Sequence, residues 1–309
     1  MTFPCCGTLC SLLIATGLLL GTIGQSPSCS GQDAGSDKGS AVAGINIWPQ
    51  LAPGESTAEV GTPLAPRPSD PTITRIEKIT RPTIDVFPAK NPSGSAVLIL
   101  PGGGFRYVVP DLEGSEAAEW LGELGITAFV LRYRTSEGPE NAWKRPLQDS
   151  QRAVRWIRAR ADQWNIDPAK VGLLGFSAGG QVAAIHLTSV ESAYEAIDQI
   201  DRQSFRPDFS LLIYPWRIYD EQTRSLISPI RVTQQTPPAF IVHTHDDNST
   251  SLGAVHYYAC LKVQAIPAEL HVYQTGGHGY ATRSRPNSMI GTWKDRATEW
   301  LQINGLSAD

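Results

Sequence analysis

The segment Gly175-Phe176-Ser177-Ala178-Gly179-Gly180 constrains the fold of this chain more than any other. An apolar run, residues 171–174, precedes it and is long enough for a buried strand, while residues 181–187 after it are typical of a helix. A sharp turn from a strand into a helix strains the serine backbone and leaves room only for small neighbours. The segment therefore predicts that Ser177 is a nucleophile at the end of a strand, beside free N–H groups of a helix N-terminus.

The composition is that of a globular domain with enough apolar residues for a sizeable core. The chain has 309 residues, of which 41% are hydrophobic and 18% are charged. Its net charge is -4 and it has no Lys/Arg run, so we do not expect it to bind nucleic acids or anionic membranes. Of the five cysteines only Cys29 and Cys260 lie beyond residue 10, which predicts neither a disulfide framework nor a cysteine metal site.

The N-terminal residues predict a leader followed by a linker. The stretch Leu9–Ile23 is almost entirely apolar, so residues 1–25 are expected to be a signal peptide or an N-terminal anchor. No basic residue precedes Lys38, and Cys29 leaves lipidation open as an alternative. We expect an exported protein, periplasmic, extracellular or at the cell surface, without stable membrane contact once the leader is removed. Residues 26–44 predict a disordered linker, and residues 45–309 the catalytic domain.

From residue 96 onward, apolar strands alternate with amphipathic helices. The expected strands are 96–100, 127–133, 208–214, 239–243 and 268–273, and the expected helices are 114–124, 146–164, 252–263 and 288–303. This pattern predicts an α/β fold with a mostly parallel central sheet and helices on both faces. Residues 73–80 and 83–87 are expected to pair as antiparallel strands at the sheet edge. The four arginines of the helix 146–164 are expected on its solvated faces.

The order of polar residues after the later strands predicts a base and an acid for Ser177. A serine hydroxyl needs a base to accept its proton, and the base needs an orienting carboxylate. Asp246 and Asp247 follow the strand 239–243, and His278 follows the strand 268–273 within Gly276-Gly277-His278-Gly279. These positions lie at the carboxyl ends of strands, where open α/β sheets form their sites. We expect His278 to be the base, and Asp247 rather than Asp246 to be the acid.

Backbone N–H groups for a developing oxyanion are expected from two places. One is Ala178, which follows the nucleophile. The other is the glycine loop Pro101-Gly102-Gly103-Gly104, which follows the strand 96–100. The side chains expected to line the substrate pocket flank these motifs: Arg106, Tyr107, Trp216 and Tyr280. Of the other histidines, His186 and His271 are expected to be structural, within a helix and a strand.

Taken together, the motifs resemble one family of α/β-hydrolases, the acetylxylan and feruloyl esterase-like enzymes that act on plant cell-wall polysaccharides. The motifs are Pro101-Gly-Gly-Gly-Phe105, Leu131-Arg-Tyr-Arg134, Gly175-Phe-Ser-Ala-Gly-Gly180, Leu212-Ile-Tyr-Pro215, His243-Thr-His-Asp-Asp247 and Gly276-Gly-His-Gly279. The resemblance implies the α/β-hydrolase fold, a Ser177, Asp247 and His278 triad, and oxyanion donors at Gly102, Gly103 and Ala178. It also implies hydrolysis of acyl esters, acetyl above all, on a polysaccharide such as xylan, without a cofactor.

Three other functions compete with this interpretation. The segment His243-x-His245-x-Asp247 matches the start of a zinc site, but Asn248 stands where a further histidine would be needed. A small-molecule carboxylesterase or an arylformamidase would use the same triad. A non-catalytic binding protein of this fold would usually lack one triad residue, and none is missing here. The sequence fixes neither the acyl group, nor the alcohol side of the substrate, nor the oligomeric state.

Overall fold

The computed structural model describes residues 41–136, 138 and 141–308. The predicted signal peptide, residues 1–25, and the predicted linker up to residue 40 lie outside this part of the chain. The linker prediction was wrong for residues 42–44, because strand β1 (Val42–Asn46) begins there and pairs with β4 (Thr83–Phe87). No helix among the described residues is both long and apolar enough to span a bilayer.

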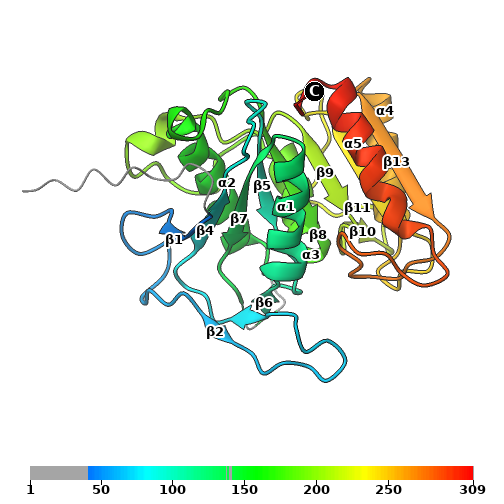
Figure 1. Ribbon diagram of the computed structural model, residues 1–309, viewed down its shortest axis with the longest axis horizontal. Coiled ribbons are helices and arrows are strands. Elements are labelled where there is room, and N and C mark those ends of the chain that lie inside the picture. The colour runs from blue at the N-terminus through cyan, green and yellow to red at the C-terminus, as the bar shows by residue number, and fades with distance from the viewer. Residues whose placement is uncertain (1–40, 137, 139–140, 309) are drawn as a thin grey trace, which may run out of the picture. The chain divides into compact units, whose positions relative to one another are not determined.

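The central sheet has eight strands in the order β1-β4-β7-β5-β8-β9-β12-β13 (Figure 1). The other six strands are Ala96–Leu100 (β5), Thr127–Arg132 (β7), Val171–Phe176 (β8), Ser210–Ile213 (β9), Ala239–Thr244 (β12) and Ala268–Tyr273 (β13). All neighbouring pairs from β7 to β13 are parallel, whereas β1 and β4 pair antiparallel at the edge. The structure thus confirms the predicted mostly parallel sheet with antiparallel N-terminal strands.

Helices cover both faces of this sheet, as the uniformly apolar strands require (Figure 1). Helices α1 (Glu116–Glu123) and α5 (Trp293–Ile303) contribute to one apolar layer. Helices α2 (Lys144–Arg158), α3 (Ser177–Thr188) and α4 (Leu252–Val263) contribute to the other. The side chains of successive β5 residues pack into alternate layers: Leu98 into the layer of α2 and α3, and Val97 into the layer of α1.

The predicted pairing of residues 73–80 with residues 83–87 was wrong. Only Ile76–Glu77 forms a strand there (β3), and it pairs with β2 (Thr62–Pro63) and β6 (Tyr107–Val108) in a separate small sheet. The partners of β4 are instead β1 and β7, both antiparallel. A further hairpin joins β10 (Tyr219–Asp220) to β11 (Ser225–Leu226). These short elements lie outside the central sheet.

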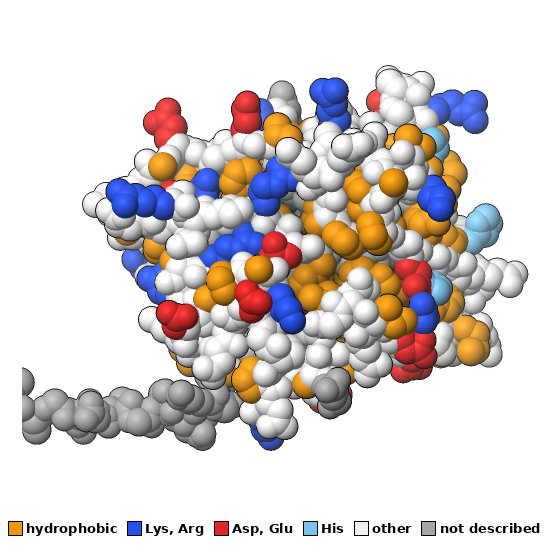
Figure 2. All heavy atoms as spheres, turned by 90° about the horizontal axis from the view of Figure 1, so that it is seen from above, with side chains coloured by type: hydrophobic (Ala, Val, Ile, Leu, Met, Phe, Trp, Pro, Cys, Tyr) orange, Lys and Arg blue, Asp and Glu red, His pale blue; other side chains and the backbone are white. Residues whose placement is uncertain are grey.

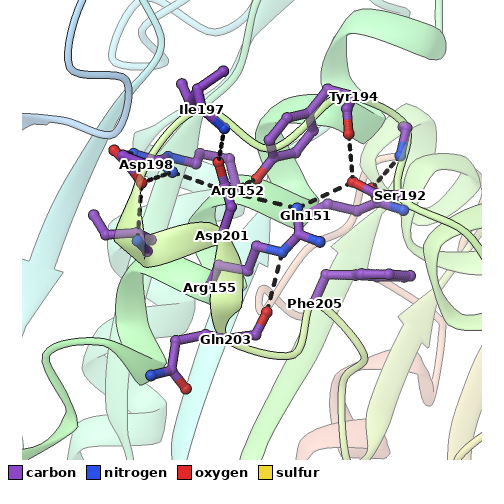
Figure 3. Close-up of polar contacts among 12 residues, drawn as sticks. Gln151, Arg152, Arg155, Ser192, Tyr194, Ile197, Asp198, Asp201, Gln203 and Phe205 are labelled. Atoms are coloured by element: carbon purple, nitrogen blue, oxygen red, sulfur yellow. Dashed lines mark hydrogen bonds and ion pairs between the residues drawn. The ribbon is translucent and has the colours of Figure 1, made fainter.

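The expectation of solvated arginines along the second helix was also wrong. Helix α2 ends at Arg158, a short 3-10 helix follows at Ala161–Trp164, and Arg152 is 1% exposed. The guanidinium of Arg152 contacts both Asp198 and Asp201, at 2.6 and 2.9 Å (Figure 3). Burial acts to lower the pKa of Arg152, but these two carboxylates outweigh it and raise the pKa. The ion pairs of Arg152 with Asp198 and Asp201 thus fix the segment after α3 against helix α2. A buried arginine requires carboxylate partners of this kind.

Candidate active site

Ser177 lies at the junction of β8 and α3 in the strained conformation that the sequence predicts. Its backbone φ is +52°, in the left-handed region that non-glycine residues rarely occupy. A Cβ on Gly179 would lie 2.0 Å from the carbonyl oxygen of Leu100, so the helix can approach β5 this closely only without a side chain. The side chain of Ser177 lines a cavity. The turn therefore presents the hydroxyl where a substrate can reach it.

The hydroxyl of Ser177 is connected to His278 and then to Asp247. Ser177 Oγ lies 2.7 Å from His278 Nε2, and His278 Nδ1 lies 2.6 Å from Asp247 Oδ2. Because the carboxylate of Asp247 accepts a hydrogen bond from the N–H at Nδ1 of His278, the proton of the neutral ring is held there and Nε2 is free to accept the proton of Ser177. The structure thus brings together the three residues that the order of motifs predicts. His278 lies 101 residues after Ser177 and 31 residues after Asp247 in the sequence.

Asp247 is held ionised in this arrangement. Burial acts to raise its pKa, but hydrogen bonds from His278 and from the backbone N–H of Ser249 (2.7 Å) outweigh burial. The pKa of Asp247 therefore lies below its ordinary value. An ionised carboxylate at this position can stabilise the positive charge that His278 acquires on taking up a proton.

Asp246, the alternative acid, has a different position. Its two oxygens accept hydrogen bonds from the backbone N–H groups of Gly277 and Gly276, at 2.9 and 3.1 Å. Asp246 therefore fixes the loop that carries His278 and does not contact the imidazole. The two adjacent aspartates therefore have different roles. Asp247 orients the imidazole of His278, and Asp246 holds the backbone of the loop that precedes it.

The glycine loop after β5 differs from the expected oxyanion hole in one donor. The backbone N–H of Gly102 donates to Oε2 of Glu113 at 2.7 Å, so it is not free to bind an oxyanion. In the described part of the chain the N–H of Gly103 has no hydrogen-bond acceptor. Ala178 is the second residue of α3, where the N–H has no acceptor within the helix. The candidate donors are therefore Gly103 and Ala178.

Glu113 is a site residue that the sequence analysis missed. It lies in a π-helical turn (Asp111–Ser115) before α1, is 5% exposed, and accepts a second hydrogen bond from the hydroxyl of Tyr214 at 2.8 Å. The same hydroxyl accepts the backbone N–H of Ala281 at 3.0 Å, three residues after His278. One buried carboxyl group therefore links the glycine loop to the loop of the base. Because Asp111 and Glu116 lie close to Glu113 in the sequence, the local pattern does not single out Glu113 as the buried acidic residue.

Burial also changes the acid–base properties of these linking groups. Burial raises the pKa of Glu113, although its hydrogen bonds from Tyr214 and Gly102 act in the opposite direction. Burial and the neighbouring Glu113 together raise the pKa of Tyr214, so that its hydroxyl stays protonated and can donate. The Tyr214 ring meets the His278 ring edge-on, with centroids 4.9 Å apart.

The predicted substrate-pocket residues divide into two groups. Arg106, Tyr107 and Trp216 line a cavity of about 960 Å³ beside Ser177 and His278. Tyr280 has no exposed surface, and its ring packs edge-on against Tyr214 with centroids 4.4 Å apart. Tyr280 is also among the residues that line this cavity, but its fully buried ring packs against Tyr214 and supports the site without offering exposed surface to a substrate.

The His243-x-His245-x-Asp247 segment does not gather its side chains around one point. His243 is fully buried, His245 is exposed, and Asp247 turns to His278. Among residues 41–136, 138 and 141–308, no three His, Cys, Asp or Glu side chains are grouped as metal ligands would be. Burial lowers the pKa of His243, which keeps its ring neutral behind the acid.

Comparison with known proteins supports the fold. A family model described as an alpha/beta hydrolase fold matches residues 97–227, from β5 through the serine turn. An acetylxylan esterase of Xylanibacter ruminicola is 32% identical over 243 residues, 71% of this chain and 46% of the relative. An endo-1,4-beta-xylanase B of Butyrivibrio fibrisolvens is 32% identical over 59% of this chain and 32% of the relative. The chain thus spans less than half the length of each of these two relatives.

The solved structures cover the domain more fully. The acetyl ester-xyloside bifunctional hydrolase of Caldicellulosiruptor lactoaceticus has 27% identity and a TM-score of 0.67, over 86% of this chain and 97% of that one. MGS-M1, an alpha/beta hydrolase from a deep-sea metagenome library, has 28% identity and a TM-score of 0.60, over 76% of this chain and 98% of that one. The likeness therefore extends over nearly the whole length of both of these solved chains.

Proposed function

The chain belongs to the α/β-hydrolase fold family, and from that premise we propose that it is a serine carboxylesterase. Its proposed reaction is hydrolysis of acyl esters, acetyl in particular, on a plant polysaccharide such as xylan. The observation that carries the proposal is the continuous hydrogen-bond chain from Ser177 through His278 to Asp247, with separations of 2.7 and 2.6 Å. That chain is what makes a serine hydroxyl nucleophilic at neutral pH.

In the proposed first half-reaction, His278 Nε2 takes the proton of Ser177 Oγ while that oxygen attacks the ester carbonyl carbon. The carbonyl oxygen gains negative charge, which the N–H groups of Gly103 and Ala178 stabilise. His278 then gives its proton to the leaving alcohol oxygen as the carbon–oxygen bond breaks. The acyl group is left on Ser177.

In the second half-reaction a water molecule takes the place of the alcohol. His278 accepts a proton from that water, the resulting hydroxide attacks the acyl carbon, and the acid product leaves as Ser177 recovers its proton. Asp247 stays ionised throughout, since its pKa is below its ordinary value. No step needs a metal ion or an organic cofactor.

Two features support a polysaccharide as the alcohol side of the substrate. Two relatives are named an acetylxylan esterase and an endo-1,4-beta-xylanase, and a structural relative is named an acetyl ester-xyloside hydrolase. In addition, a second hollow of about 1050 Å³ shares Trp216 and His278 with the first cavity, so space extends to both sides of the catalytic residues. Such an open arrangement suits a chain of sugars passing across the site.

The direct test is hydrolysis of p-nitrophenyl acetate and release of acetate from acetylated xylan, for the full chain and for Ser177→Ala. We expect kcat/KM to fall by about 10³-fold or more in Ser177→Ala. Ser204→Ala is the matched control, because Ser204 is an exposed serine that does not line the cavity. Equal activity in the wild-type and Ser177→Ala proteins would overturn the proposed function.

A further inference from the structure

Arginine is concentrated around the cavity beside Ser177. Five arginines line it, namely Arg67, Arg75, Arg106, Arg283 and Arg285, against two acidic residues, Asp70 and Glu113. This excess of positive charge contrasts with the net charge of -4 of the whole chain. Figure 2 shows the face that lies uppermost in Figure 1, where basic and acidic side chains are interspersed. The concentration of arginine is therefore a local property of the cavity.

Two of the five guanidinium groups are already neutralised. Arg75 is buried and forms an ion pair with Asp70, and Arg283 forms an ion pair with Glu116. Three guanidinium groups have no carboxylate partner among the described residues: Arg67, Arg106 and Arg285. These three, the free arginines of the cavity, approach it from three separate loops.

Two of the three free arginines, Arg67 and Arg285, are oriented by contacts that leave donors unused. Arg67 Nη2 donates to the hydroxyl of Tyr107 at 3.1 Å, and its guanidinium lies 5.7 Å from the centre of that ring. Arg285 Nη2 donates to the carbonyl oxygen of Gly279 at 3.0 Å, next to His278. A guanidinium has five N–H donors, so each group keeps several for a ligand.

The positive charge is confined to one side of the catalytic residues. The second hollow, on the other side of Trp216 and His278, is lined by Asp220, Glu221 and Asp247 and by a single arginine, Arg217. The two sides of the site therefore differ in charge. A substrate that crosses both would gain from having an anionic group on the arginine side only.

We propose that the free arginines bind an oxyanionic substituent on the sugar next to the acylated one, so that the preferred substrate is an acylated acidic polysaccharide. The inference rests on the proposed esterase function and specifies its substrate class. A carboxylate of a uronic acid or a sulfate ester provides this chemistry, because each carries negative charge and presents a pair of oxygens that a guanidinium fork can bind. The anion would be held at the cavity while the neighbouring ester lies at Ser177.

The test compares two forms of one polymer that differ only in charge. Acetylated glucuronoxylan, and the same polymer with its uronic acid carboxyl groups reduced to alcohols, are supplied to the full chain, and acetate release is measured. We expect kcat/KM to be at least about tenfold higher for the acidic form at low salt and the ratio to fall as salt rises. Reduced polymer that has been chemically sulfated distinguishes sulfate from carboxylate as the preferred group.

Variants then locate the effect. Arg67→Gln and Arg106→Gln should each lower the ratio of acidic to neutral rates toward one. Arg231→Gln removes the same charge from an exposed position that does not line the cavity, and it should leave the ratio unchanged. A general loss of activity lowers the rates on both polymers equally and leaves the ratio of acidic to neutral rates unchanged. A change in this ratio therefore reports recognition of the charge.

The outcomes separate this inference from the proposed function. Hydrolysis of p-nitrophenyl acetate together with equal rates on the two polymers, or with no release from either, would overturn the substrate class and leave the esterase proposal standing. A ratio that all three variants change equally would also overturn it. A protein inactive on every ester would overturn both.

Discussion

The backbone N–H of Gly102 donates a 2.7 Å hydrogen bond to the buried carboxyl group of Glu113. That bond fixes the start of the glycine loop, whose next residue, Gly103, is a candidate oxyanion donor. Because Glu113 also binds Tyr214, and Tyr214 binds the loop after His278, the position of the donor and the position of the base are set by one group. Glu113 is in this sense a positioning residue.

Glu113→Gln should lower kcat more than it changes KM. A glutamine has one acceptor oxygen, so either the N–H of Gly102 would face an NH₂ group and lose its hydrogen bond, or the hydroxyl of Tyr214 would have to accept where it now donates. We expect kcat to fall about tenfold to hundredfold, the effect of one hydrogen bond to a charged group. Steady-state kinetics with p-nitrophenyl acetate measures this split.

Tyr214→Phe is the comparison variant, because it removes the hydrogen bonds that the hydroxyl makes with Glu113 and with the N–H of Ala281 but keeps the bond between Glu113 and Gly102. It should lower kcat less than Glu113→Gln does. If both variants lose thermal stability and activity to the same extent, Glu113 is merely structural and the positioning role is wrong.

Asp247→Asn and Asp246→Asn should differ strongly although the residues are adjacent. Asparagine at 247 can present an N–H to His278 Nδ1, which favours the tautomer that cannot take the proton of Ser177, and kcat should fall by about 10³- to 10⁴-fold. Asparagine at 246 weakens only the anchoring of Gly276 and Gly277, so a loss of about tenfold or less is expected. Reversal of this order would assign the acid to Asp246.

Gly179→Ala should destabilise the fold, because the new methyl group would lie 2.0 Å from the carbonyl oxygen of Leu100. Helix α3 would have to move away from β5, at a cost of about 2–4 kcal/mol in the free energy of unfolding. Gly122→Ala in α1 is the control, since nothing lies within 4 Å of its added methyl group, and it should be neutral or stabilising by up to about 1 kcal/mol. Guanidinium unfolding of both variants measures the difference.

Most of the central sheet was predictable because its strands are short apolar runs between helices. The run at residues 96–100 and the helix at 252–263 appear in the structure with the predicted bounds. The pairing of residues 73–80 was not predictable in the same way. Alternation of apolar residues fixes which face a strand buries, but it does not select the partner, and β1 pairs with β4 instead.

The order of polar residues was enough to bring Ser177, Asp247 and His278 together, since loops at the carboxyl ends of parallel strands meet at one edge. Glu113 and the buried arginines show what such reasoning omits. Whether a charged side chain is buried depends on partners distant in sequence, as Arg152 and Asp198 show across 46 residues. No local pattern in the sequence identifies such a partner.

His186 should make the stability of the protein depend on pH below 6.5. Its ring is fully buried between the hydroxyl of Ser150 and the carbonyl oxygen of Phe205, both at 2.8 Å. Burial lowers its pKa from 6.5 to about 3. Between these values the unfolded chain binds a proton that the folded protein does not. The free energy of unfolding therefore falls as pH falls, by about 1.4 kcal/mol per pH unit at most.

His186→Gln removes this titration and can keep one hydrogen bond in the same place. Guanidinium unfolding of wild type and variant between pH 7 and pH 4 should show the difference in their stabilities shrinking as pH falls. Carboxylates that titrate in the same range contribute equally to both proteins, so they cancel in that difference. A difference that stays constant from pH 7 to pH 4 would mean that the buried imidazole gains its proton in the folded protein as readily as in the unfolded chain.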